Sequence, residues 1–142
     1  MNTQDEELLF KDLCSRLAYG VIVNNNGNQG KLLSIEANPY IGKIVNLIIL
    51  SDSRTADYIS NIKPYLRPMS SMTKEEYEDL SNFSELDCGH DLVKTNLFET
   101  EGVWSGYFFL SSLIDWLYAH HFDFCNLIER GLAIDCTGLN IY

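Results

Sequence analysis

Two groups of side chains in this sequence are of types that can bind a metal ion. His120 and His121 precede Asp123, and Cys88 with His90 could complete a mixed site, since imidazole and thiolate suit zinc. Adjacent residues of a helix point about a hundred degrees apart, so His120 and His121 do not converge easily on one ion. We therefore expect no metal site. One histidine should pack at a helix end, where the helix dipole favours its protonated form, and the other should be solvated.

A second arrangement has the residue types of nucleophilic catalysis. Cys88, His90 and Asp91 lie close together in the sequence, but a catalytic thiol and imidazole usually come from separate elements that fix their geometry. No GxSxG, P-loop, GxGxxG or HExxH pattern occurs. We expect no enzymatic activity and no bound cofactor. The alternative is a small enzyme that uses His90 or the His120–His121 pair.

Charge is distributed unevenly along the 142 residues. The chain has twenty acidic and ten basic side chains, a net charge of −10. Residues 1–70 hold seven of each, so the whole acidic excess lies in residues 71–142, mostly between Glu75 and Glu101. This charge argues against binding to a nucleic-acid backbone or to an anionic membrane, because both attract basic groups.

The acidic stretch could itself be functional. Carboxylates interleaved with aromatic rings can occupy a basic groove on a partner protein, because their charges stand where phosphates would. The candidate residues for such partner binding are Glu75, Glu78, Asp79 and Trp104. Charge that only keeps the protein soluble explains the same pattern, since paired carboxylates are typical of a solvated helix face.

Residues 63–73 form a stiff segment with Pro64, Pro68, Tyr65 and Arg67. Such segments can present a recognition surface, so Tyr65 and Arg67 are further partner-binding candidates. A rigid connector between a sheet and a helix is the simpler interpretation, because proline reduces the entropy lost on ordering a linker.

The first half of the chain should begin with a helix and continue as a sheet. Thr3 and Glu6 form a capping-box pattern that predicts a helix over residues 4–18, and Gly20 is a natural helix end. Around an Asn-Gly signal, two β-rich segments predict a hairpin over residues 21–23 and 31–35.

Two further strands complete the predicted sheet. Residues 44–50 are rich in β-branched side chains and predict a central strand covered on both faces, and residues 57–62 predict a short strand. We expect a meander of four or five strands that ends at Pro64. Pro64 and Pro68 should stop regular pairing, because proline cannot donate to a ladder.

The second half should be mainly helical. Thr73 and Glu76 form another capping box, which opens an acidic helix that ends at about residue 82. Residues 83–106 have poor periodicity and predict a loop. After Ser111 and Ser112, residues 113–118 predict a helix that buries Leu113, Ile114 and Leu117, with Leu110 on the same face. A last short helix should end at Gly131, with Asp123 as its N-cap and a hydrophobic staple between Phe122 and Leu127.

These elements predict an α+β protein with an N-terminal helix, a small antiparallel meander that could close into an SH3-like barrel, and a helical C-terminal part. We expect one domain, with a helix-and-sheet lobe over residues 1–70 and an acidic lobe over residues 71–142. Four cysteines without CxxC spacing predict reduced thiols. The acidic N-terminal residues do not resemble a signal peptide, and the apolar runs are too short to span a bilayer, so we expect a cytoplasmic protein.

Several strings together resemble a family of short uncharacterised proteins from gut Bacteroides-type bacteria and their phages. They are LLFKDLCSRLAYGV, GKLLSI, IKPYLRPMSSMT and AHHFDF followed by LIERGLA, which cover most of the chain outside residues 75–106. This family has no established activity, so the resemblance implies a phage or mobile-element origin and no catalytic residue. It makes a bacterial cytoplasmic setting more plausible.

The expected function is that of a non-enzymatic accessory protein that binds another macromolecule. The expected partner is a protein, with no direct binding to nucleic acid or membrane, and a homo-oligomer is possible. The alternative function is an acidic inhibitor of a host defence nuclease complex, which would act by mimicking nucleic acid.

Overall fold

A computed structural model describes residues 1–49, 53–85 and 103–142 of the chain. These residues form two compact units. Unit 1 comprises Met1–Met69 and His121–Tyr142, and unit 2 comprises Ser70–His120. The second lobe was expected to begin at residue 71, and unit 2 begins at Ser70. The last part of the chain, however, returns to unit 1 and completes its core.

Unit 1 begins with α1 (Thr3–Arg16), whose N-cap is Asn2 rather than Thr3 of the predicted capping box. The Asn2 side chain accepts a hydrogen bond from the Asp5 N–H at 2.8 Å and donates another to the Asp5 carboxylate at 2.7 Å. Asparagine is at least as good an N-cap as threonine, which explains the one-residue difference. The helix continues as a 3₁₀ turn, η1 (Leu17–Tyr19), and ends at Gly20 with a φ of 67°, as predicted.

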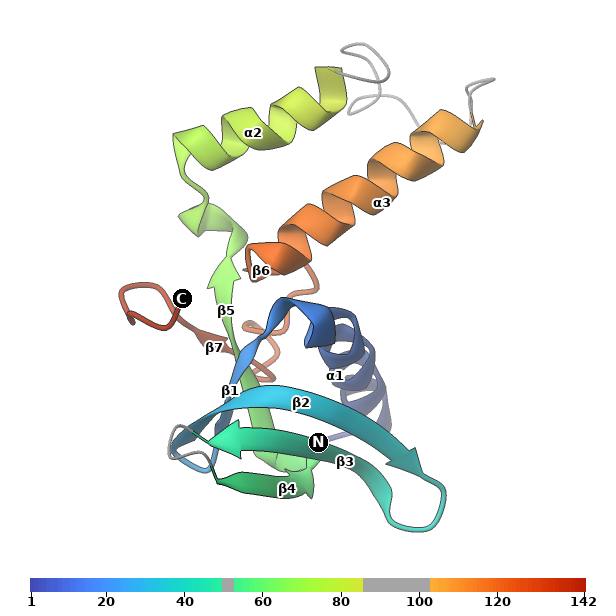
Figure 1. The fold of residues 1–142 in the computed structure, drawn as a ribbon, viewed down its shortest axis with the longest axis vertical. Helices are drawn as coiled ribbons and strands as arrows, with labels where there is room; N and C mark the ends of the chain where they lie inside the picture. Colours follow the sequence, from blue (N-terminus) through green and yellow to red (C-terminus); the bar gives the residue numbers. More distant parts are fainter. Residues whose placement is uncertain (50–52, 86–102) are drawn as a thin grey trace. The chain divides into compact units, whose positions relative to one another are not determined.

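The next four strands form the predicted antiparallel meander (Figure 1). They are β1 (Ile22–Asn25), β2 (Asn28–Asn38), β3 (Gly42–Ile49) and β4 (Arg54–Tyr58). Asn26 and Gly27 form the β1–β2 turn with φ values of 50° and 92°, and such left-handed pairs favour tight hairpins. The hairpin is therefore confirmed. A strand also lies where residues 44–50 predicted one, although residue 50 and the side chains of residues 46–49 lie outside what the structure describes, so coverage of both faces stays a prediction.

The path after β4 differs from the prediction. Ile59–Asn61 form a 3₁₀ turn, η2, where a strand over residues 57–62 was expected, and β5 (Ile62–Pro68) follows directly. Pro64 lies opposite Val23 in the β1–β5 pair, so the prolines do not end the sheet. Proline lacks only the N–H, while neighbouring residues keep the ladder, with the Arg67 N–H donating to the His121 carbonyl at 2.9 Å.

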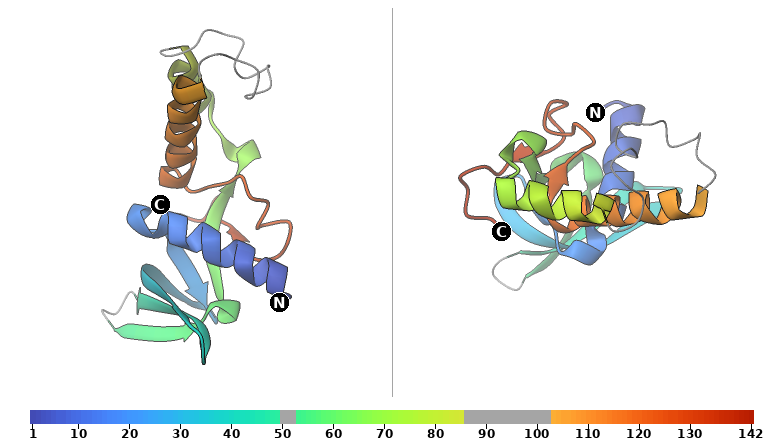
Figure 2. Two further views of the ribbon diagram at one scale, coloured as in Figure 1. Left: turned by 90° about the vertical axis from the view of Figure 1, so that its right-hand side faces the viewer. Right: turned by 90° about the horizontal axis from the view of Figure 1, so that it is seen from above.

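The C-terminal segment adds two short parallel strands to β5. These are β6 (Phe122–Asp123) and β7 (Ile134–Asp135), so the sheet is mixed and its order is β4-β3-β2-β1-β5-β6, with β7 also paired to β5. This open order does not confirm the SH3-like barrel. The α+β class is confirmed. Figure 2 shows α1 crossing one side of this sheet, where Leu9 and Leu13 join a core with Val23, Leu32 and Val45.

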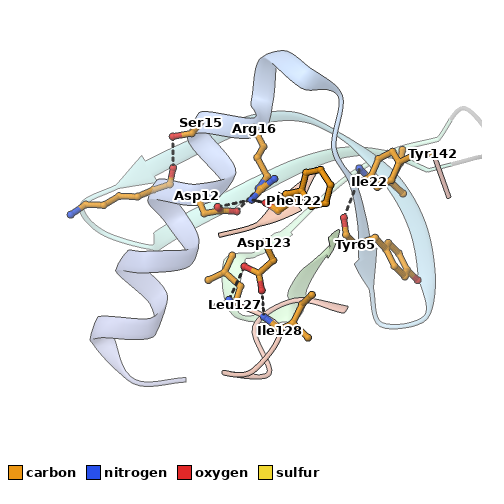
Figure 3. Close-up of polar contacts among 11 residues, drawn as sticks. Asp12, Ser15, Arg16, Ile22, Tyr65, Phe122, Asp123, Leu127, Ile128 and Tyr142 are labelled. Carbon is orange, nitrogen blue, oxygen red and sulfur yellow. Dashed lines mark hydrogen bonds and ion pairs between the residues drawn. The ribbon is translucent and has the colours of Figure 1, made fainter. Parts of the chain in front are cut away.

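One side chain extends the pairing of β1 with β5. The strand register would place Ile22 opposite Tyr65, but the Tyr142 hydroxyl lies between them (Figure 3). It accepts a hydrogen bond from the Ile22 N–H at 3.2 Å and donates to the Tyr65 carbonyl at 2.8 Å. The Tyr142 ring also stacks on His121, with centroids 3.6 Å apart. The Tyr142 hydroxyl thus supplies the pairing that the two strands no longer make directly.

The short helix predicted to end at Gly131 is absent. Asp123 accepts hydrogen bonds from the Leu127 N–H at 2.9 Å and the Ile128 N–H at 2.8 Å, whereas a helix N-cap would accept from residue 125 or 126. The residues between Asp123 and Gly131 form turns, and Asn126 has a φ of 58°, which interrupts helical geometry. Asp123 is therefore the cap of a turn rather than of a helix. Phe122 and Leu127 are both fully buried.

Unit 2 contains the helices α2 (Lys74–Glu85) and α3 (Val103–Ala119). Both are longer than predicted, so the ends of the expected loop over residues 83–106 are helical, and residues 86–102 lie outside the described residues. Ser111 and Ser112 are exposed inside α3 instead of preceding it. Leu117 is buried as expected, whereas Leu113 and Ile114 are half-buried; the Leu110 side chain is not described. No helix of the described ranges has the length and apolarity needed to cross a membrane.

Arg16 forms a buried ion pair within α1 and a hydrogen bond to the C-terminal segment. Arg16 is fully buried and Asp12 is 2% exposed, and the guanidinium donates to the Asp12 carboxylate from Nε at 2.7 Å and from Nη2 at 3.0 Å. Nη2 also donates to the Phe122 carbonyl at 2.8 Å (Figure 3). Burial raises the pKa of Asp12, and the adjacent guanidinium opposes that rise.

Replacing Arg16 by methionine should destabilise unit 1 by about 3–5 kcal/mol, because the Asp12 carboxylate and the Phe122 carbonyl would lose a buried partner. Urea unfolding followed by circular dichroism measures the loss. The double variant Asp12→Leu/Arg16→Met should be less destabilised than Arg16→Met alone, because it leaves no unpaired charge. An Arg16→Met protein as stable as wild type would show that the pair does not hold α1 in place.

Replacing Asp123 by alanine should cost about 1–2 kcal/mol, because the N–H groups of Leu127 and Ile128 would lose their acceptor. Asp123→Asn should lose less, since the amide oxygen still accepts one hydrogen bond. Thermal melting of the three proteins gives the comparison. An alanine variant with an unchanged melting temperature would mean that this turn does not depend on the Asp123 side chain.

Candidate functional site

The start of α2 is fixed by the predicted capping box. The Glu76 N–H donates to Thr73 Oγ1 at 3.2 Å, and the Thr73 N–H donates to the Glu76 carboxylate at 2.9 Å. Glu75 and Glu76 lie in the first turn, where negative side chains interact favourably with the helix dipole. The reciprocal bonds define where the helix begins and therefore which side chains share a face.

Three carboxylates form what we call the acidic face of α2: Glu75, Glu78 and Asp79. Their i, i+3, i+4 spacing places them on one side of the helix, and all three are exposed. Lys74 lies 3.7 Å from Glu78, but both side chains are largely exposed, so this pair contributes little. Tyr77 is 63% exposed on the same helix, but its i+2 spacing from Glu75 places it on a different side.

The acidic face belongs to the unit that carries most of the net charge. Residues 70–120 contain ten acidic side chains against Lys74 and Lys94. Like charges at i, i+4 spacing repel each other, as for Glu75 and Asp79. Salt screens this repulsion, and a basic partner would replace it with attraction. The local charge therefore favours contact with a cationic surface.

The other predicted partner-binding residues lie elsewhere. Tyr65 is only 6% exposed, and its hydroxyl accepts a hydrogen bond from the Asn24 side chain at 3.0 Å. Arg67 is half-buried, with its guanidinium 4.3 Å from the centroid of the Phe122 ring. Both belong to β5 of unit 1, whereas the acidic face belongs to unit 2. Trp104 lies in α3, but its side chain is outside the described residues.

The two adjacent histidines point to different neighbours. The His120 ring stacks on Trp116, with centroids 3.9 Å apart, and its Nδ1 lies 2.8 Å from the Trp116 carbonyl oxygen. His120 thus packs at the end of α3, as predicted for one histidine. His121, expected to be solvated, is instead 8% exposed and has a φ of 60°. In the described ranges no three His, Cys, Asp or Glu side chains are placed to hold a metal ion, and Cys88, His90 and Asp91 lie outside those ranges.

A shallow depression of about 450 Å³ lies in the turns of the C-terminal segment. Its lining comprises Phe124, Cys125, Asn126, Glu129 and Arg130. Burial raises the pKa of the Cys125 thiol, and the nearby Asp12 carboxylate raises it further, so the thiol stays protonated at neutral pH. Arg130 is engaged with Asp5 at 2.9 Å. The depression therefore contains no activated nucleophile.

Comparison with known proteins gives no assignment: no family model, no curated protein and no solved structure matches this chain. The candidate site is thus defined by the side chains of the protein itself. Among the described residues, the acidic face of α2 combines exposure, charge and a fixed local geometry. The sequence pointed to its carboxylates through the charge count and the capping box, whereas the exposure of Tyr77 required the structure.

We expect the protein to fold without a structural metal or disulfide, because 46% of its residues are apolar and the described histidines diverge. Differential scanning calorimetry with and without EDTA, and with and without a reductant, should give the same melting temperature. A fall of about ten degrees with either reagent would reveal a structural site, since such sites contribute several kcal/mol.

Proposed function

We propose that this protein is a non-enzymatic binding module whose acidic face of α2 engages a basic surface on a partner protein. The observation that carries the proposal is the exposure of Glu75, Glu78 and Asp79 on one side of α2, in a unit with ten acidic and two basic side chains. Exposed charges of one sign increase the association rate with an oppositely charged partner.

A narrower form of the proposal makes the partner's basic surface a nucleic-acid groove. The carboxylates of one helical turn would then stand for phosphates, as expected of an acidic inhibitor of a defence nuclease complex. This form predicts that DNA and the protein compete for the same partner surface. We further propose that the protein acts in the bacterial cytoplasm and originates from a phage or mobile element. The resemblance described in the sequence analysis supports this origin.

The triple variant Glu75→Gln/Glu78→Gln/Asp79→Asn should associate with its partner at least about tenfold more slowly, because electrostatic attraction would be lost. Its stability should be unchanged or slightly higher, because mutual repulsion is also removed. An affinity pulldown from the native host with mass spectrometry identifies the partner. Stopped-flow association across a salt series then compares the variant with wild type.

A matched control removes three exposed carboxylates from unit 1 through Glu36→Gln, Glu129→Gln and Asp135→Asn. In Asp135→Asn, the new amide oxygen would still accept the bond that the Thr137 N–H makes with Asp135. This control should retain most of the wild-type rate, because it changes the net charge equally but leaves α2 intact. Equal slowing in both variants would indicate net charge alone. An association rate insensitive to all six substitutions and to salt would overturn the proposal.

A further inference from the structure

The sheet of unit 1 has a basic side that its core does not use. Successive side chains of a strand point to opposite sides of the sheet. Leu32 is buried on the core side and Lys31 lies on the other side; in the same way, Ile62 is buried and Lys63 lies on the other side. Lys31 is opposite Ile48 in the strand register, and Ile48 is opposite Arg54, so Lys31 and Arg54 share a row. We call Lys31, Arg54 and Lys63 the basic sheet face; all three side chains are exposed. Exposed Glu36 lies on the same side, opposite Ile44, so the charges of these four residues sum to +2.

These cations differ from most others in the described part of the chain. Arg16, Lys43, Lys74 and Arg130 each lie within 4 Å of a carboxylate, on Asp12, Glu7, Glu78 and Asp5. None of the three residues of the basic sheet face makes such an ion pair with a described residue. The electrostatic attraction of this surface is therefore available to an external anionic group.

The shape of the basic sheet face suits a helix. Lys63 on β5 and Arg54 on β4 are the outermost of the three, with β1, β2 and β3 between these strands. At about 4.8 Å between neighbouring strands, the cations extend over roughly 20 Å. A helix with its side chains is about 10–12 Å wide and could lie across this surface. Tyr58 lies on the same side of the sheet, in the row of Ile44, and is 54% exposed.

The chain itself carries the complementary surface. We propose that the basic sheet face of one copy binds the acidic face of α2 of a second copy. The exposed cations would attract the exposed carboxylates, with Tyr58 adding apolar area. This inference rests on the proposed function, because it assumes that the acidic face binds a basic surface, and it names one such surface.

The division of charge between the units sets the orientation of this contact. Unit 1 has ten acidic and eight basic side chains, whereas unit 2 has ten and two. Unit 2 of one copy is therefore repelled less by unit 1 of another copy than by a second unit 2. A contact between two different surfaces is heterologous, so the assembly can grow beyond a dimer or close into a ring. It would also cover the acidic face and compete with other basic partners.

Two charge-reversal variants test this pairing. The first is Lys31→Glu/Arg54→Glu/Lys63→Glu, and the second is Glu75→Lys/Glu78→Lys/Asp79→Lys. In sedimentation velocity at near-physiological salt, wild type should show a mean mass that rises with concentration, and this rise should disappear in each variant alone. An equimolar mixture of the two variants should regain it, because each then meets its complement. Lys11→Glu, an exposed reversal on α1, should behave like wild type.

A wild type that stays monomeric up to about 1 mM would overturn the inference, as would a mixture that does not regain association. Circular dichroism checks that both variants fold, and the milder Lys31→Gln/Arg54→Gln/Lys63→Gln replaces the first variant if it does not. Binding of a single-stranded oligonucleotide to the basic sheet face, without self-association, would also contradict it. Titration with decalysine separates the two proposals. If the protein is monomeric but binds decalysine through α2, only the self-association proposal is contradicted. If it is monomeric and does not bind decalysine, both proposals are contradicted.

Discussion

The rest of unit 1 depends on the hydrogen bonds that the buried Arg16 guanidinium donates. It joins Asp12 of α1 to the Phe122 carbonyl of β6, and so connects the first helix with the segment that returns after unit 2. Because an ionised pair in the core is costly to desolvate, the two partners must be held in register. The returning segment then pairs with β5, places Asp123 over its turn and brings Tyr142 between β1 and β5. The core is thus closed by residues from both ends of the chain.

This closure leaves residues 70–120 as a separate unit with its own charge. Unit 1 is nearly neutral, whereas unit 2 concentrates the negative charge and presents part of it on the exposed face of α2. The stability of the fold does not require the acidic face of α2 to bind anything, because solvated carboxylates are stable on a helix surface. The proposed binding to a basic partner uses this concentration of charge, and the proposed self-association also uses cations on the sheet of unit 1 that make no ion pair to a described residue.

Local signals predicted those elements whose geometry depends on neighbouring residues. The Thr73–Glu76 capping box and the Asn26–Gly27 turn could both be predicted from the sequence, because each is formed by residues that are close in the chain. The position of Pro64 inside a strand could not be predicted, because that strand pairs with residues such as His121, which is more than fifty residues away in the chain. Likewise, Asp123 was predicted as a cap, but the left-handed Asn126, which prevents a helix, was not predicted. For the candidate site, the carboxylates followed from charge and spacing, whereas burial of Tyr65 depended on tertiary packing.

The central claim is that the acidic face of α2 binds basic surfaces. The most direct measurement is a titration of the isotope-labelled protein with decalysine, followed by backbone amide chemical shifts. The account predicts saturable shifts concentrated in α2 around Glu75, Glu78 and Asp79, which weaken as salt is raised. Shifts spread evenly over all exposed carboxylates of both units, or no shifts in α2, would contradict it.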